Sequence, residues 1–368
     1  GNLSQVMANI QSAGYTIDFQ SPVQLGADVS VSSGQGDLHF AQSIDGEFML
    51  TLDTASALTL DAAIGSVAPL SGLRASAQQL VVSSSVAVKS QGVELLSANE
   101  MTLAGAWTTT DGGAVTLTNQ GILQWGNGVD MDLDGSFLQN GLGEVALAGN
   151  IFTNSKAILF QGPIVLHDDV DLKTSEGLGD ITLEKTVNGS NDLTLLAGTG
   201  VVNFKQQIGN FTPLLRLQIG RPESAISPAV VGATNAVFSE LVQVGLGGIY
   251  IHVLNSVSSA FNFRTTADLK IEGGGAFSIR EDILASQGNA QRLVFDIDVL
   301  INPLTGETLL IDTQDSNGDI IFEKKVYGPY KLALEAGSGN ITFKDTVGLD
   351  GSDFQEANYL KGLEINSA

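Results

Sequence analysis

The fold of this chain is decided by GDITLEKTVNGSNDLTLLAGTGVVNFKQQIGNFTPLLRLQI, residues Gly179–Ile219. Related stretches begin at Gly36, GDLHFAQSIDGEFMLTLDTASALTLDAAIGSVAPLSGL, and at Gly318, GDIIFEKKVYGPYKLALEAGSGNITFKDTVG. The three stretches share a Gly-Asp opening, alternating apolar residues and a closing Ile/Val-Gly, and they begin about 140 residues apart. Self-similarity at a fixed spacing indicates an array of like units rather than a set of unrelated domains.

The repeat divides the chain into three predicted strand-repeat modules, at residues 1–150, 151–290 and 291–368. The first module starts within a repeat, because Ile10 and Ile17–Phe19 match Ile151 and Ile158–Phe160. The third module is incomplete. We therefore expect the sequence to be a section of a longer chain.

A shorter motif recurs inside each module: one large apolar residue, three mostly polar residues, then Ile or Val. Successive motifs in a module begin 20 to 27 residues apart. This spacing predicts that Leu183 and Phe204 occupy equivalent inward positions in consecutive coils. The motif begins at Phe19, Phe40 and Leu60, at Phe160, Leu183 and Phe204, and at Phe295, Phe322 and Phe343.

Strict alternation before the motifs, as in Leu193-Thr194-Leu195, sends every second side chain to one buried face of a strand. Turn-forming Gly-Asp and Ala-Gly-x-Gly groups separate the strands. Short strands in coils of about 20–23 residues predict an all-β fold, a right-handed parallel β-helix in which each coil buries its apolar face on the next. Tandem β-sandwich domains are the alternative architecture.

Composition excludes several classes of function. The formal net charge of −23 repels nucleic acid and anionic lipid, so we expect no nucleic-acid partner. No run of 18 apolar residues occurs, so we expect no membrane insertion. The chain has no cysteine, which rules out disulfides and thiolate metal sites and is common in long secreted bacterial proteins.

The order of these motifs resembles that of filamentous-haemagglutinin-like large exoproteins, the strand-repeat surface adhesins of bacteria. The resemblance covers roughly half of the chain. It implies a secreted or surface-anchored protein with a right-handed β-helix shaft that serves attachment or biofilm formation. The residues that carry it are Ile158, Phe160, Pro163, Gly179, Asp180, Val187, Gly189, Leu193, Leu195, Gly198, Gly200, Phe204, Gly209, Pro213, Leu214 and Leu217.

Two acidic clusters are candidate calcium sites. Asp130, Asp132 and Asp134 have the D-x-D-x-D-G spacing that opens a calcium loop, although position twelve is Gly141 rather than Glu. The second cluster contains Asp312, Asp315 and Asn317. The competing interpretations are a half-buried strand at the first cluster, with Met131 and Leu133 inward, and turn chemistry at the second.

Catalysis is not expected, because the three histidines, His39, His167 and His252, lie far apart in the sequence. We therefore predict a structural shaft segment, located outside the cell or at its surface, that mediates extension and attachment to glycans or proteins of a host or neighbouring cell. The alternatives are a subunit of a self-associating extracellular filament and a polysaccharide-degrading β-helix enzyme whose close carboxylates act as acid and base.

Overall fold

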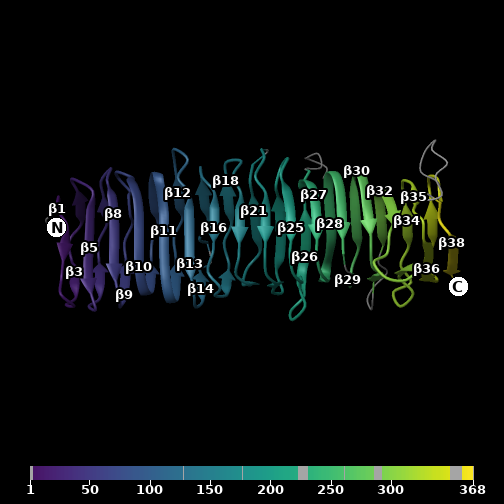
Figure 1. Cartoon of the computed structure of the whole chain (residues 1–368), viewed down its shortest axis with the longest axis horizontal. Coiled ribbons are helices and arrows are strands. Elements are labelled where there is room, and N and C mark those ends of the chain that lie inside the picture. The colour runs from purple at the N-terminus through teal and green to yellow at the C-terminus, as the bar shows by residue number, and fades with distance from the viewer. Residues whose placement is uncertain are drawn as a thin grey trace. The chain divides into compact units, whose positions relative to one another are not determined.

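The computed structural model describes residues 3–126, 128–175, 177–222, 231–260, 262–285, 292–348 and 359–367. These residues contain no α-helix, and so none that could cross a membrane. The chain is an all-β parallel solenoid of about 15 turns, with coils about 22 residues apart (Figure 1). It divides into two compact units, Gly1–Gly179 and Asp180–Ala368. The module boundaries at 150/151 and 290/291 stay a prediction.

The strands of the first unit are β1 (Ser4–Val6), β2 (Ile10–Gln11), β3 (Ile17–Phe19), β4 (Val23–Leu25), β5 (Val29–Gly34), β6 (Leu38–Phe40), β7 (Ile44–Asp45), β8 (Met49–Thr54), β9 (Ala57–Leu60), β10 (Leu70–Val82), β11 (Val86–Leu103), β12 (Trp107–Thr109), β13 (Val115–Asn119), β14 (Leu123–Trp125), β15 (Met131–Leu133), β16 (Phe137–Gln139), β17 (Val145–Leu147), β18 (Ile151–Thr153), β19 (Ile158–Phe160), β20 (Ile164–Leu166) and β21 (Val170–Lys173).

The strands of the second unit are β22 (Ile181–Leu183), β23 (Val187–Asn188), β24 (Asp192–Leu196), β25 (Val201–Phe204), β26 (Leu214–Ile219), β27 (Ala233–Phe238), β28 (Val242–Ser259), β29 (Phe263–Thr265), β30 (Leu269–Ile279), β31 (Ile283–Ala285), β32 (Leu293–Ile301), β33 (Thr308–Asp312), β34 (Ile320–Phe322), β35 (Val326–Tyr327), β36 (Lys331–Gly337), β37 (Ile341–Phe343) and β38 (Gly362–Ser367).

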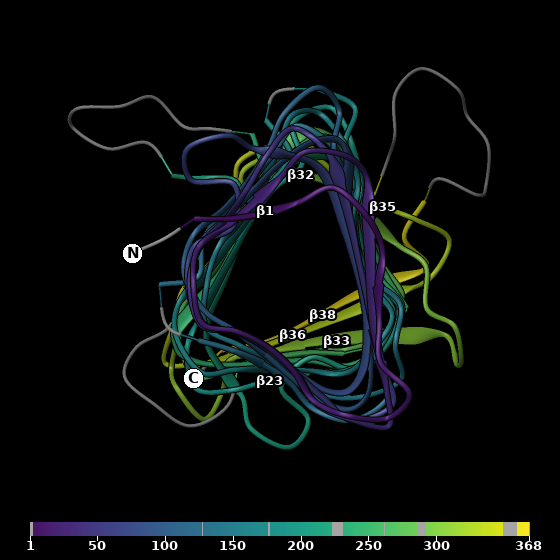
Figure 2. The same cartoon turned by 90° about the vertical axis from the view of Figure 1, so that its left-hand side faces the viewer.

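Strands one coil apart pair in parallel within each unit. In the first unit Phe19 lies beside Phe40, and Phe40 beside Leu60. In the second unit Leu183 lies beside Phe204. These registers confirm the repeated motif, and parallel pairing between coils excludes the tandem β-sandwich, whose sheets are antiparallel. The right-handed winding stays a prediction. The first coils, drawn in purple at the front of Figure 2, trace a three-sided outline.

Large inward side chains fill the coils of both units. In the first unit the Phe19 and Phe40 rings stack with centroids 4.5 Å apart, and Trp125 lies 5.7 Å from Phe137. The second unit contains a continuous phenylalanine column in which neighbouring ring centroids lie 5.0 to 6.1 Å apart. The interior is therefore a packed core. The column consists of Phe204, Phe238, Phe263, Phe277, Phe295, Phe322 and Phe343.

The recurring Gly-Asp pair has a structural explanation at the coil corner. The carbonyl oxygen of Gly36 accepts a 2.6 Å hydrogen bond from the buried Ser33 hydroxyl. A Cβ at Gly36 would lie 2.2 Å from the backbone carbon of Tyr15 on the previous coil, so no larger residue fits there. The same hydroxyl-to-carbonyl bond recurs at the other two openings, from Thr174 to Gly179 and from Thr313 to Gly318.

Candidate functional site

Many acidic and amide side chains bond to the backbone of the next coil. The side-chain oxygen of Asp28 accepts the Met49 N–H at 2.9 Å, and that of Asp180 accepts the Val201 N–H at 2.8 Å. We call this arrangement an Asx clamp. It satisfies a backbone donor at a corner where the strand ladder is interrupted. Other residues that form it are Asn9, Asp37, Asp45, Asp130, Asn150, Asn188, Asn235, Asp268, Asp282, Asp298, Asn317 and Asp319.

The first predicted calcium cluster lies along one outward side of β15 and its flanks. Met131 and Leu133 are buried, so Asp130, Asp132 and Asp134 share the opposite face. Alternate residues of a strand lie about 6.6 Å apart, which spreads the three carboxylates instead of converging them on one ion. The structure therefore places these residues side by side without a common centre.

The outer two carboxylates of this cluster already have partners. Asp130 accepts hydrogen bonds from the backbone and side-chain nitrogens of Asn150, at 3.0 and 2.9 Å. Asp134 accepts one from the Asn154 amide and one from the Gly112 N–H, and these bonds lower the pKa of its carboxyl. Asp130 Oδ1 and both oxygens of Asp134 are therefore engaged in hydrogen bonds within the chain.

The second predicted cluster is a turn between β33 and β34. Asp312 accepts the Gln314 N–H at 2.7 Å, and Asn317 accepts the Ser338 N–H at 2.9 Å from the next coil. Asn317 has a φ of 54°, a left-handed conformation that asparagine tolerates better than most residues. Asp315 is exposed. Across the described part of the chain, no three His, Cys, Asp or Glu side chains are grouped so that they could hold a metal ion.

Asp132 and Asp134 also line an open depression of about 480 Å³ in the first unit. The rest of its wall is mixed, with the polar Thr108 and Asn154 and the apolar Phe152 among the lining residues. Acid and base catalysis of sugar cleavage needs two carboxyl groups with separated pKa values at the scissile bond. Asp134 is held ionised by its two hydrogen bonds, so it is poorly suited to the role of general acid.

His39 bridges three consecutive coils of the first unit. Its Nδ1 lies 2.9 Å from Asp18 Oδ1, and its Nε2 lies 2.8 Å from Asp61 Oδ2. A neutral imidazole has only one N–H, so both contacts are hydrogen bonds only in the imidazolium form. The bond to Asp61 is the main reason that the pKa of His39 is raised above its ordinary value of 6.5. His39 lies between the buried Leu38 and Phe40 of β6, so its side chain faces outward, where it links neighbouring coils.

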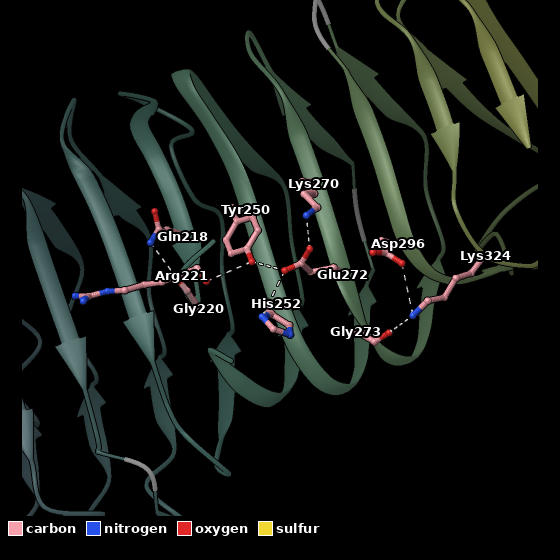
Figure 3. A network of polar contacts seen from close by, with 10 residues as sticks. All are labelled: Gln218, Gly220, Arg221, Tyr250, His252, Lys270, Glu272, Gly273, Asp296 and Lys324. Atoms are coloured by element: carbon pink, nitrogen blue, oxygen red, sulfur yellow. Dashed lines mark hydrogen bonds and ion pairs between the residues drawn. The ribbon is translucent and has the colours of Figure 1, made fainter. Parts of the chain in front are cut away.

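A polar network covers one face of the second unit (Figure 3). Glu272 of β30 accepts the Tyr250 hydroxyl and the Lys270 ammonium group, and His252 Nδ1 lies 3.4 Å from the same carboxylate. Burial favours the neutral form of Glu272, but the hydrogen bonds from Lys270 and Tyr250 outweigh it and lower its pKa. Burial and the Glu272 bond raise the pKa of Tyr250. The network ties β28 to β30.

Lys324, two coils beyond β30, reaches back to the residue next to Glu272. Its Nζ donates a 2.6 Å hydrogen bond to the Gly273 carbonyl and lies 3.7 Å from Asp296 Oδ1 (Figure 3). The pairing of β30 with β32 shifts register between Glu272 and Ala276, which interrupts the backbone ladder around Gly273. Sequence reasoning missed this contact, because the two residues are 51 positions apart in the chain.

The three histidines occupy three separate places. His39 is in the first coils, His167 is exposed after β20, and His252 belongs to the Glu272 network. No hydrogen bond in the described ranges joins a histidine ring to a serine hydroxyl. Both tryptophans are buried core residues at 1% and 2% exposure, so neither Trp107 nor Trp125 forms a sugar-stacking platform.

Comparison with known proteins gives no relative: no protein-family model, curated protein or solved structure matches this chain. The fold and the contacts above are therefore the basis for an assignment of function.

Proposed function

We propose that this chain is a structural shaft segment of a secreted or surface-anchored bacterial adhesin, similar in plan to the filamentous-haemagglutinin-like exoproteins. One observation carries the proposal. Three kinds of interaction join neighbouring coils. They are the parallel backbone ladders, the packed apolar core and side-chain hydrogen bonds to the backbone, such as Asp28 to Met49 and Lys324 to Gly273. Such an arrangement suits extension and stiffness, and each added coil contributes about 4.8 Å.

The role is mechanical and non-enzymatic in this proposal, and the chain works outside the cell. The acidic residues support it, because many of them hold the next coil and the remainder keep the surface negative and soluble. Attachment to glycans or proteins of a host or neighbouring cell would be made by the complete protein, with this segment setting the distance.

The test is to display the chain on a bacterium between a surface anchor and an epitope tag. A shaft raises the height of the tag above the cell, measured by fluorescence localisation, and removal of residues 115–136 lowers it by one coil without loss of the fold. Val115 and Phe137 are paired neighbours in consecutive coils, so this deletion keeps the register. An unchanged tag height in the presence and absence of the chain would contradict the proposal.

The enzyme alternative is examined with the same protein. Incubation with polysaccharides should release no new reducing ends or unsaturated products. Hydrolysis or elimination that disappears in an Asp132→Asn variant would replace the shaft assignment with catalysis at the depression.

A further inference from the structure

The depression of about 480 Å³ in the first unit lies over a ladder of outward side chains. Parallel pairing places Ala87, Thr108, Asp132, Phe152 and Lys173 side by side, one from each successive coil. Neighbours in this ladder lie about 4.8 Å apart, the spacing of adjacent strands. Thr108 and Asp132 are shorter than Phe152, so the phenyl ring forms a wall of the depression and the Asp132 carboxylate lies at its foot.

One side of the Phe152 ring already holds a cation. The Lys173 ammonium group lies 4.8 Å from the ring centroid and pairs with the Asp171 carboxylate. In the ladder the ring lies between Lys173 and Asp132, and the depression is lined by Asp132 but not by Lys173. The depression therefore borders the ring on the side of Asp132, opposite the ammonium group.

The Asp132 side of the ring offers the same two groups, a carboxylate and an aromatic face, without a cation. Asp132 is exposed, and no hydrogen bond or ion pair joins its carboxylate to another residue in the described part of the chain. The described residues that line the depression include no lysine, arginine or histidine. Lys156 acts electrostatically on Asp134 from outside this lining.

Charge decides between a cationic and a neutral ligand. The chain carries −23, which attracts cations and repels anions. A neutral sugar could donate hydroxyl hydrogen bonds to Asp132, but it would cover the carboxylate without supplying a counter-charge. A cation removes that cost, because it replaces the lost hydration with an ion pair. The depression therefore favours a cationic group.

The shape of the site distinguishes a guanidinium from an ammonium group. A guanidinium is planar, so its face can stack on an aromatic ring while its edge donates two parallel hydrogen bonds to a carboxylate. Phe152 and Asp132 are adjacent in the ladder and provide these two surfaces. Thr108 and Asn154 line the same space and carry further acceptor oxygens for the remaining N–H groups.

We propose that this depression binds the guanidinium group of an arginine side chain on a partner protein. Asp132 is the carboxylate that pairs with it, and Phe152 is the surface on which it stacks. The inference goes beyond the proposed shaft function and does not depend on it, because a side site of this kind would serve a shaft, a filament or an enzyme alike.

The test is saturation-transfer NMR of the full chain with N-acetyl-arginine amide as the probe. Binding in the millimolar range is expected. N-acetyl-citrulline amide has the same shape without the charge and should not bind. N-acetyl-lysine amide should bind at least about 3-fold more weakly, because its ammonium group neither stacks nor forms the paired hydrogen bonds.

Variants locate the binding. Asp132→Asn should weaken it at least about 10-fold and Phe152→Leu at least about 3-fold. Neither substitution touches the core, so circular dichroism should show an intact fold. Glu144→Gln removes the same charge from an exposed position of the first unit that does not line the depression, and should change the affinity by less than about 2-fold.

Several results would overturn the proposal. One is the absence of binding at about 50 mM N-acetyl-arginine amide, a concentration at which even weak sites fill. Another is equal binding of the citrulline or lysine probe, which would show that the site does not recognise a guanidinium. Equal effects of Asp132→Asn and Glu144→Gln would reduce the attraction to net charge. Displacement of the arginine probe by neutral methyl hexosides would assign the depression to sugars instead.

Discussion

Replacement of Phe204 by aspartate tests the register on which the fold rests. Phe204 is 1% exposed, and its ring stacks on Phe238 with centroids 5.1 Å apart and an interplanar angle of 7°. Loss of a buried phenylalanine ring costs about 3–5 kcal/mol, and a carboxylate placed there without a partner adds to this. We expect a loss of at least about 4 kcal/mol in the free energy of unfolding of the second unit.

Urea unfolding followed by two probes measures this loss. With a slope of about 3 kcal/mol per M, the midpoint should fall by about 1.3 M. Far-UV circular dichroism reports both units, whereas Trp107 and Trp125 lie in the first unit and their fluorescence reports that unit alone. The circular dichroism midpoint should therefore fall more than the fluorescence midpoint.

The neighbouring residue supplies the control. Asn203 precedes Phe204 in β25 and is not buried, so Asn203→Asp adds the same charge on the outer face. It should change stability by no more than about 0.5 kcal/mol. If Phe204→Asp unfolded at the same urea concentration as Asn203→Asp, the inward register of the solenoid would be wrong.

Three further contacts give measurable effects. The stability that His39 gives the first unit, followed by tryptophan fluorescence, should be complete below pH 6.5, the ordinary pKa of histidine, and should decline as the pH rises through the raised pKa of His39. His39→Gln should remove this decline, and a decline that persists in the variant would contradict the bridge. Lys324→Met should lower the free energy of unfolding by about 1–2 kcal/mol, because it leaves the Gly273 carbonyl without its hydrogen bond. Lys344→Met breaks an exposed ion pair with Glu323 and should lower it by less than about 1 kcal/mol. Equal losses in the two variants would refute this distinction. Asn188→Ala should destabilise the second unit by about 1–2 kcal/mol and Asp45→Ala the first unit equally, because each removes the clamp on equivalent loops; unaffected urea midpoints would show that the clamps do not contribute.

Calcium binding at the first acidic cluster stays a prediction, and the tertiary contacts show which arrangement of the carboxylates the motif alone leaves open. The spacing of Asp130, Asp132 and Asp134 is that of a calcium loop, but the same spacing on an extended strand separates the carboxylates. Whether the segment curves around an ion or lies straight depends on β12 and β18, the strands beside β15, which the motif does not contain. Partners of Asp130 and Asp134 at Asn150 and Asn154 come from the next coil.

Sequence alone predicted the parallel solenoid, the coil length and the inward positions such as Leu183 and Phe204, and left the tandem β-sandwich as the alternative that parallel pairing between coils then excluded. It did so because alternation and turn chemistry are local properties, and a coil that repeats them must stack on its neighbours. Tertiary structure decided which side chains meet across coils, including His39 with Asp61 and Lys324 with Gly273. Those contacts depend on the number of residues each coil inserts at its corners, and the insertions vary from coil to coil.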